Sequence, residues 1–420
     1  MNRPSRLPGL RLTAAAFVLC FGVSCDPAEP APAETSDASA YPHASEPIGS
    51  VREIYDGTLS PEMAVNTFRN IDRLFPSRVI PASTNPLPLP ISDEPLSPIS
   101  INDEGDLYTL DEFLELNRIA GLLVIHNGEI KYEQYRYGNT RETRWMSMSV
   151  AKSVTSTLFG IALEEGLIES LEDSVVAYIP ELAGSAYDGA SVRDVLMMAS
   201  GVQWVETYTD PTSDRRALLE AQIAQDPGGA IEVMAALPRA TEPGTRNLYN
   251  TGETQIAGEV LYRAIGGPLS DYLHERIWEP FGMEADATWW LESADGVEIG
   301  GSGFNAVLRD YGRLGLFVLG GGVVDGQRLF PEGWVAEAGS PKVLKGGDSI
   351  DYGYLWWPGT SEAARQDGAF SGVGIHGQAL YINPAVDLVI AVWGARPRPT
   401  GGAPVDVDVV FDAIAELLRD

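Results

Sequence analysis

Residues 145–166 read WMSMSVAKSVTSTLFGIALEEG and carry a Ser and a Lys three positions apart, Ser149 and Lys152. The apolar residues that follow Ser149 recur at helical spacing, which predicts a helix that ends near Gly166. Residues three apart share one face of a helix, so we expect the Lys152 amine to reach the Ser149 hydroxyl.

This pair can supply a nucleophile and its base. A Ser hydroxyl must lose its proton as it attacks, and a Lys amine can accept that proton only if its pKa falls from about 10.4. The apolar helix around Lys152 supplies the burial that lowers an amine pKa. The alternative is a helix-capping Ser beside a solvated Lys. However, only four of the 29 basic residues are Lys, so this chain uses Arg where it needs plain positive charge.

Composition and charge exclude several functions. The chain has 420 residues, of which 44% are hydrophobic and 21% charged, as in an ordinary globular protein with ample core. Its net charge of −30 excludes nucleic acid as a partner, because phosphate binding requires a basic face. The sequence contains no metal-ligand cluster, phosphate-binding loop or dinucleotide fingerprint, so we expect no metal and no cofactor.

Residues 1–25 predict an export signal. Three Arg accompany an apolar run, Leu12 to Val23, that is shorter than the roughly 20 residues needed to span a membrane. The run ends in Gly-Val-Ser-Cys at 22–25, which resembles the lipobox of bacterial lipoproteins. We therefore expect a periplasmic or cell-surface protein attached to a membrane through lipidated Cys25, with plain secretion as the alternative.

The rest of the chain divides into three parts. Residues 26–47 are rich in Ala, Pro, Glu and Ser and predict a disordered tether. Residues 48–109, which include a Pro-rich run at 81–98, are expected to form an extended N-terminal arm. Residues 110–420 then form the main domain.

Strand signals stand at both ends of the main domain, with helical signals between them. Two β-rich runs at 121–125 and 130–135 flank Asn127-Gly128, a hairpin turn signal. Later runs rich in aromatic or β-branched residues predict strands at 352–357, 378–382 and 388–393. We expect an α+β (α/β) protein, in which both chain ends build an antiparallel sheet with flanking helices and residues 167–287 form an inserted, mostly helical part.

Two further segments carry groups suited to the same chemistry. The turn-rich loop at 242–252 delivers Tyr249 just before a helix, and a phenol near a cationic amine can donate to a leaving group. Gly374 and Gly377 allow a substrate to approach the backbone, and a strand edge offers N–H groups to an oxyanion. The alternatives are that Tyr249 packs its loop onto the core and that His376 lies in the core beside a plain Gly-rich turn.

In this order and spacing, Ser149-x-x-Lys152, Tyr249-Asn250-Thr251 and the Gly-rich strand at 374–377 resemble the three motifs of the penicillin-recognising serine hydrolases. Those motifs are Ser-x-x-Lys, Tyr-x-Asn and Lys-Thr-Gly. Within this superfamily, which includes class C β-lactamases, the chain is most similar to the 6-aminohexanoate-oligomer hydrolases and family VIII-type esterases. The resemblance covers about residues 50–420 and implies a β-lactamase/DD-peptidase-like fold.

The resemblance also implies roles for individual residues. Ser149 would be the acyl-enzyme nucleophile, Lys152 its base partner and Tyr249 the proton shuttle. The backbone N–H groups of Ser149 and Ile375 would form the oxyanion hole. The further candidates for the substrate pocket are His376, Thr251, Gly374, Gly377, Trp204 and Trp356, and core packing is the alternative for the aromatic ones.

The sequence departs from the superfamily pattern at two points. Thr251 stands where class C β-lactamases have Asn, and the third motif, at 372–374 or 374–376, has no Lys to meet a β-lactam carboxylate. These departures favour a serine hydrolase of small ester or linear amide substrates. The alternatives are a β-lactamase or D-alanyl-D-alanine carboxypeptidase, and a catalytically silent protein that binds cell-wall peptides.

Overall fold

The computed structural model describes residues 41–419. The predicted export signal, Cys25 and most of the predicted tether lie outside the described residues. Among residues 41–419, no helix combines the length and the apolar character needed to cross a membrane.

A six-stranded antiparallel sheet forms the centre of the described unit, in the order β13-β14-β15-β16-β4-β5. Its strands are β13 (Trp357–Pro358), β14 (Phe370–Gly374), β15 (Gln378–Asn383), β16 (Leu388–Gly394), β4 (Ile119–His126) and β5 (Glu129–Tyr135). Strand β16 pairs with β4, so segments from both ends of the main domain meet in the sheet. This confirms the predicted fold class.

The predicted hairpin turn joins β4 to β5. Asn127 and Gly128 both have positive φ, 52° and 77°, and the strand residues that flank them pair with each other. Two successive residues of positive φ match the right-handed twist of the strands, which is why Asn-Gly favours this connection.

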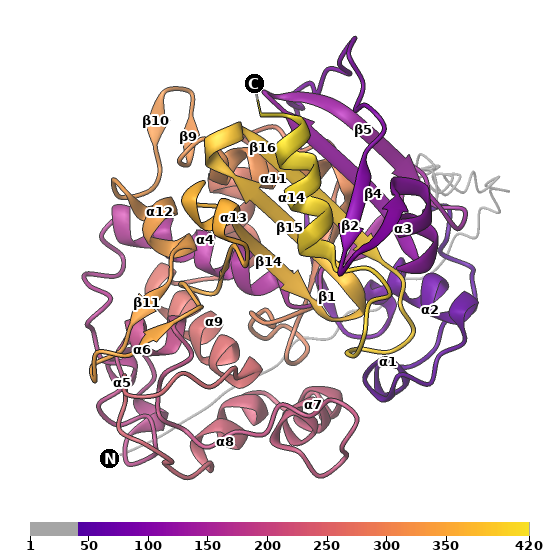
Figure 1. Ribbon diagram of the computed structural model, residues 1–420. Coiled ribbons are helices and arrows are strands. Elements are labelled where there is room, and N and C mark those ends of the chain that lie inside the picture. Colours follow the sequence, from indigo (N-terminus) through magenta and orange to yellow (C-terminus); the bar gives the residue numbers. More distant parts are fainter. Residues whose placement is uncertain (1–40, 420) are drawn as a thin grey trace, which may run out of the picture. The chain divides into compact units, whose positions relative to one another are not determined.

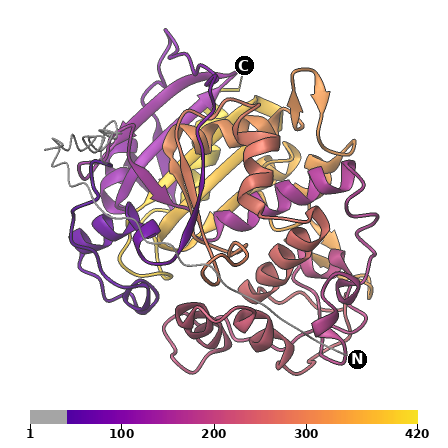
Figure 2. The same cartoon turned by 180° about the vertical axis from the view of Figure 1, so that it is seen from behind.

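Helices cover both faces of this sheet (Figures 1 and 2). Helices α4 (Val150–Glu164) and α11 (Leu308–Leu319) pack on one face. Helices α3 (Leu110–Leu116) and α14 (Val407–Leu417) pack on the other, where Phe411 and Ile414 join an apolar cluster with residues of β4, β15 and β16. Helix α4, which begins directly after Ser149, is therefore fixed against the sheet.

The segment between α4 and β7, where the sequence predicts a mostly helical part at 167–287, consists of helices joined by irregular segments. Its helices are α5 (Val175–Tyr178), η2 (Pro180–Leu182), α6 (Val192–Leu196), α7 (Asp214–Ala224), α8 (Gly229–Ala235), α9 (Thr251–Ile265), α10 (Leu269–Leu273) and η3 (His274–Trp278). Helix α9 packs against α4. This contact brings the residues before α9, Tyr249 included, towards the start of α4.

A second antiparallel sheet, which the sequence analysis missed, has the order β1-β7-β8-β6. Its strands are β1 (Ser77–Ile80), β7 (Ala287–Trp290), β8 (Phe304–Val307) and β6 (Arg144–Met146). Each strand has only three or four residues, which is too short for a recognisable alternating pattern. Strand β6 ends three residues before Ser149, so this sheet holds the chain that leads into α4.

The remaining described elements are short. They are α1 (Val51–Asp56), α2 (Pro61–Phe68), η1 (Ile71–Arg73), β2 (Ser100–Asp103), β3 (Asp106–Thr109), β9 (Val323–Val324), β10 (Gln327–Arg328), α12 (Trp334–Gly339), β11 (Lys342–Val343), β12 (Ser349–Ile350), α13 (Glu362–Gln366), η4 (Ile375–Gly377) and η5 (Pro384–Val386).

The N-terminal part differs from the expected tether and extended arm. Residues 41–47 are packed, since the Tyr41 hydroxyl donates to the Arg69 carbonyl over 2.8 Å and Glu46 forms an ion pair with the Arg69 side chain at 2.7 Å. Helices α1, α2 and η1 occupy much of 48–73, so the arm is not extended throughout. Buried apolar residues at helical spacing give these helices a core contact that a free arm would lack.

Two strand predictions near the C-terminal end were wrong. Residues 352–357 form an irregular segment, with Leu355 at a φ of 60°, and only Trp357–Pro358 pairs as a strand. The aromatic residues that suggested a strand are buried, so their pattern reports burial and not pairing. The predicted Gly-rich strand at 374–377 is instead the end of β14 followed by the turn η4.

Candidate active site

Ser149 and Lys152 lie together at the start of α4. Ser149 is the residue that precedes the helix, and its side chain caps no helical N–H group. The Lys152 amine donates to the Ser149 Oγ over 3.0 Å and to the Gly301 carbonyl over 3.0 Å. Lys152 is only 1% exposed, and burial lowers the pKa of its amine to about 7. The amine can therefore be neutral at physiological pH.

The Tyr249 ring lies beside the Lys152 amine. The Lys152 Nζ is 5.5 Å from the centre of the Tyr249 ring, which also stacks on Trp357 with 5.6 Å between ring centres. Burial and the negative charge of Glu206 raise the pKa of the Tyr249 phenol well above its ordinary value, and the Ser149 side chain opposes part of this rise. The phenol therefore stays protonated at neutral pH.

The amides of Ser149 and Ile375 form a possible anion-binding pair. Among the described residues, neither amide donates a hydrogen bond to a backbone or side-chain acceptor. Gly374 lets them approach, since a Cβ at this position would lie 2.6 Å from the Ser147 carbonyl oxygen and 3.1 Å from the Ser149 amide nitrogen. Such N–H groups can hold the oxygen of a tetrahedral intermediate.

Both segments that carry these amides contain a strained residue. Met148, just before Ser149, has a φ of 43°, and His376, just after Ile375, has a φ of 67°. This conformation costs free energy for a residue with a Cβ, more for Met than for His, so the surrounding structure must hold it in place. The fold thus imposes backbone strain on both sides of the candidate oxyanion hole.

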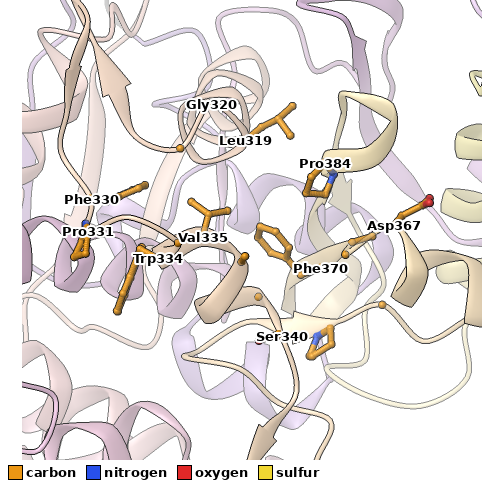
Figure 3. Close-up of a pocket in the computed structure, with 18 of the residues that line it drawn as sticks. Leu319, Gly320, Phe330, Pro331, Trp334, Val335, Ser340, Asp367, Phe370 and Pro384 are labelled. Atoms are coloured by element: carbon orange, nitrogen blue, oxygen red, sulfur yellow. The ribbon is translucent and has the colours of Figure 1, made fainter.

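Ser149 opens into a cavity of about 410 Å³. Its lining residues are Ser149, Tyr208, Tyr249, Trp357, Val373, Gly374, Ile375, Arg396, Pro399, Thr400, Gly401, Gly402 and Ala403. A larger and mostly apolar cavity, of about 760 Å³, lies elsewhere, between Trp334 of α12 and Phe370 of β14 (Figure 3). It contains none of the residues named as catalytic, so we assign the chemistry to the smaller one.

Several predicted pocket residues do not line the Ser149 cavity, whereas Gly374 does. His376 is fully buried and donates from Nδ1 to the Arg396 carbonyl over 2.7 Å, and burial lowers the pKa of its imidazole to about 4. Gly377, at a φ of 93°, leaves room for the Arg396 side chain, which a Cβ would approach to 3.1 Å. Both residues therefore lie behind the residues that line the Ser149 cavity.

The two predicted pocket tryptophans belong to the core. Trp204 is 4% exposed and donates to Glu206, and Trp356 is 2% exposed and packs edge-on against Phe370. Their neighbours in sequence or space, Trp357 and Tyr208, line the cavity instead. Trp356 and Trp357 are adjacent, yet the first is buried in the core and the second lines the cavity, which composition alone cannot resolve.

Thr251 supports the site without lining it. Its amide donates to Glu206 Oε2 over 3.0 Å, and its hydroxyl donates to the other Glu206 oxygen. Because Thr251 begins α9 two residues after Tyr249, Glu206 fixes the position of the tyrosine loop. Glu206 was not among the predicted site residues, since nothing local marks a contact between residues 45 positions apart.

A buried cation also influences the Lys152 amine. Arg215 of α7 is 1% exposed and lies over the Tyr55 ring, with 4.4 Å between its guanidinium carbon and the ring centre. Its positive charge helps to lower the pKa of the Lys152 amine, whereas the charge of Glu206 acts in the opposite direction. Burial is the larger influence, so the amine pKa remains low.

Comparison with known proteins assigns the chain to a family. A family model described as beta-lactamase matches residues 110–415. The chain belongs to the beta-lactamase family. It is 31% identical to the 6-aminohexanoate-dimer hydrolase of Paenarthrobacter ureafaciens, over 73% of this chain and 82% of that protein. The chain is therefore a hydrolase of the β-lactamase-type serine hydrolases.

Solved structures agree on the fold. A Bacillus anthracis protein assigned as a 6-aminohexanoate-dimer hydrolase superposes with a TM-score of 0.72 at 23% identity, over 84% of this chain and 91% of that one. A family VIII carboxylesterase superposes with a TM-score of 0.54 at 19% identity, over 71% of this chain and 91% of that one. The β-lactamase/DD-peptidase-like fold and the expected family relationship are both confirmed.

The environment of Lys152 predicts the pH dependence of hydrolysis. If neutral Lys152 is the base, kcat/KM for p-nitrophenyl butyrate should fall about tenfold per pH unit below about pH 7. Glu206→Gln removes a charge that raises the Lys152 pKa, so the acid limb should move to lower pH. Glu220→Gln, an exposed carboxylate paired with Arg52, should leave the limb in place. If Glu206→Gln leaves the acid limb of the pH profile at the same pH, the assignment of Lys152 as the base is wrong.

Proposed function

We propose that the protein hydrolyses carboxylic esters or small linear amides through an acyl-enzyme formed on Ser149. The observation that supports this best is the buried Lys152 amine, which lies 3.0 Å from the Ser149 hydroxyl and has a pKa lowered to about 7. A base of this pKa can take the hydroxyl proton and return it at neutral pH.

Lys152, and not Tyr249, is the base in this proposal. The raised pKa of the phenol keeps Tyr249 protonated, so it cannot accept a proton from Ser149 at neutral pH. A protonated phenol beside Lys152 can instead donate to the leaving group and be recharged by the ammonium that forms on Lys152. The Gly301 carbonyl holds the amine in place during this exchange.

The first half-reaction then proceeds as follows. The Ser149 oxygen attacks the substrate carbonyl as its proton passes to Lys152, and the Ser149 and Ile375 amides bind the oxyanion. The bond from the carbonyl carbon to the leaving oxygen or nitrogen breaks, and this atom receives a proton through Tyr249. The product is an ester of Ser149 with the acyl part of the substrate.

The second half-reaction repeats these steps with water. A water molecule attacks the acyl-enzyme and gives its proton to the Lys152 and Tyr249 pair. The same two amides bind the second oxyanion, and Ser149 leaves with a proton from Lys152. The carboxylic acid product departs and the site returns to its starting state.

The third motif supports esters and linear amides over β-lactams. Gly372 faces α4, and a Cβ there would lie 2.8 Å from the Ser153 hydroxyl, so a longer side chain has no room. The next residue, Val373, lines the cavity with an apolar side chain. The strand of the third motif therefore lacks the Lys that meets a β-lactam carboxylate in the superfamily, and the cation of this cavity is Arg396, in the segment after β16.

Replacing Ser149 with Ala should lower kcat for p-nitrophenyl butyrate at least about 1,000-fold, because the acyl-enzyme can no longer form. A fluorophosphonate probe should label the wild type and not this variant. Ser156→Ala is the matched control on the same helix, since its buried hydroxyl has no hydrogen-bond partner among the described residues. Activity or labelling retained in Ser149→Ala would disprove the assigned nucleophile. An unlabelled wild type would favour the catalytically silent alternative.

Arg396 is a second determinant of substrate choice. It lines the Ser149 cavity, forms no ion pair with any described carboxylate, and burial lowers the pKa of its guanidinium. A substrate carboxylate would pair with this charge. We expect Arg396→Met to lower kcat/KM for the mono-p-nitrophenyl ester of succinate about tenfold or more and to leave the butyrate ester nearly unchanged.

Arg398→Met is the control for this comparison, because Arg398 is exposed and does not line the cavity. An equal loss on the charged and the neutral ester would contradict a role for Arg396 in charge recognition.

Nitrocefin separates the enzymatic alternatives. The same Ser149 and Lys152 serve a β-lactamase, so turnover of nitrocefin that exceeds ester turnover would favour that function. The 6-aminohexanoate dimer tests whether the linear amide named for the Paenarthrobacter relative is also a substrate here.

A further inference from the structure

The cavity of about 760 Å³ shown in Figure 3 has no part in the proposed reaction. It lies between the end of α11, the hairpin of β9 and β10, helices α12 and α13, and the start of β14. The side chains of Leu319, Val335 and Phe370 lie around it, each from a different one of these elements (Figure 3). A volume of this size with a mostly apolar lining is typical of sites for small molecules. We call it the apolar cavity.

The walls of the apolar cavity are fixed by packing behind them. Trp334 stacks on Tyr354 with 5.6 Å between ring centres, and Phe330 packs edge-on against Phe317 at 5.2 Å. Proline has a fixed φ, so it adds rigid backbone to a wall. Four of the lining residues are prolines, namely Pro331, Pro341, Pro358 and Pro384. The cavity is therefore formed before any ligand enters.

Part of the apolar lining is in contact with water. Val323 is 42% exposed, and Leu319 and Val335 are half-buried. Large apolar side chains that share one open cavity lose contact with water when an apolar ligand covers them, which is favourable. An alkyl chain is the simplest group that fits such a lining.

The charges of the lining favour an anionic group on this ligand. The charged lining residues are Arg328, Arg365 and Asp367. Arg419 compensates the charge of Asp367, because its Nη1 donates to Asp367 Oδ1 over 3.0 Å. Arg328 is exposed and forms no ion pair with a carboxylate of residues 41–419. The lining thus has a surplus of positive charge, although the chain as a whole has a net charge of −30.

Arg365 is the cation best placed to hold an anionic group. Its Nε donates over 3.0 Å to the carbonyl of Gly359, another lining residue, which holds the guanidinium beside the cavity. Its one ionic partner within residues 41–419 is Asp351, which is 69% exposed and lies 3.2 Å from Nη2. An ion pair this exposed is weak. The Arg365 side chain is itself 47% exposed, so a ligand can reach it.

We propose that the apolar cavity binds a medium-chain alkyl carboxylate, with its chain among the apolar side chains and its carboxylate beside Arg365. Arg328 adds positive charge to the same lining. A carboxylate has a single charge, which suits one guanidinium better than the higher charge of a phosphate ester does. The apolar cavity shares no lining residue with the Ser149 cavity, and the proposal does not depend on the proposed hydrolysis.

The test is calorimetric titration of three matched probes into the protein. The probes are octanoate, octanamide, which has the same chain with a neutral head, and butyrate, which has the same head with a shorter chain. We expect saturable binding of octanoate, and binding of the other two at least about tenfold weaker. The proposal is wrong if octanamide or butyrate binds as tightly as octanoate, or if octanoate shows no saturable binding.

Two variants with matched controls locate the alkyl chain. Val335→Trp fills the cavity and should weaken octanoate binding about tenfold or more, whereas Val343→Trp, at a 66% exposed valine outside the lining, should not. Ala336→Glu adds a carboxylate at an exposed lining position and should weaken octanoate binding as well. Ala363→Glu, on α13 and outside the lining, should not. Cooperative thermal unfolding of all four variants would show that they fold. Unchanged octanoate binding in Ala336→Glu would overturn the proposal.

Arginine variants distinguish this cavity from the Ser149 cavity. Arg365→Met should weaken octanoate binding about tenfold or more, whereas Arg398→Met, at an exposed residue outside both cavities, should not. Arg396 of the Ser149 cavity is the other cation that a carboxylate could meet, so Arg396→Met should leave octanoate binding in place. If Arg396→Met abolishes binding and Val335→Trp does not, octanoate binds only beside Ser149 and the proposal is overturned.

Discussion

The burial of the Lys152 amine is the constraint on which the site depends. A fully buried ammonium is costly, and the two acceptors within 3.0 Å of Lys152, Ser149 and Gly301, are uncharged. Neutralising the amine therefore relieves an electrostatic penalty of the fold and produces the base that the proposed mechanism requires. The stability of the fold and the proposed chemistry both favour the neutral Lys152 amine, so no further group is required to activate the Ser149 hydroxyl.

The two sheets explain how the reacting groups meet. The four-stranded sheet ends at β6 and delivers Ser149, while the six-stranded sheet ends β14 at Gly374 and delivers the Ile375 amide. Helix α4 lies against β14, so the two amides approach across a contact in which only a glycine fits. The strained residues Met148 and His376 flank this contact. The proposed oxyanion hole is thus a property of the packing between sheet and helix.

Features that depend on nearby residues could be predicted from the sequence, whereas features that depend on tertiary packing could not. The spacing of Ser149 and Lys152 fixes their contact within one turn of helix, and Asn127-Gly128 fixes a hairpin through its own backbone preference. The charges of Glu206 and Arg215 change the pKa of Lys152 because tertiary packing brings them close, and no residue near Lys152 in the sequence indicates this contact. The aromatic residues near Trp356 indicated a cavity wall but did not show which side chain faces the cavity. Trp357, and not Trp356, lines it.

The distribution of charge restricts how an anionic substrate can be recognised in the Ser149 cavity. With a net charge of −30, the chain repels anions at long range, and salt screens this field beyond about 8 Å at physiological ionic strength. Recognition of an anionic group must therefore come from a cation at contact distance, and the Ser149 cavity contains one in Arg396. An anionic substrate is therefore held only at contact distance, where the charge of Arg396 outweighs the screened field of the rest of the chain.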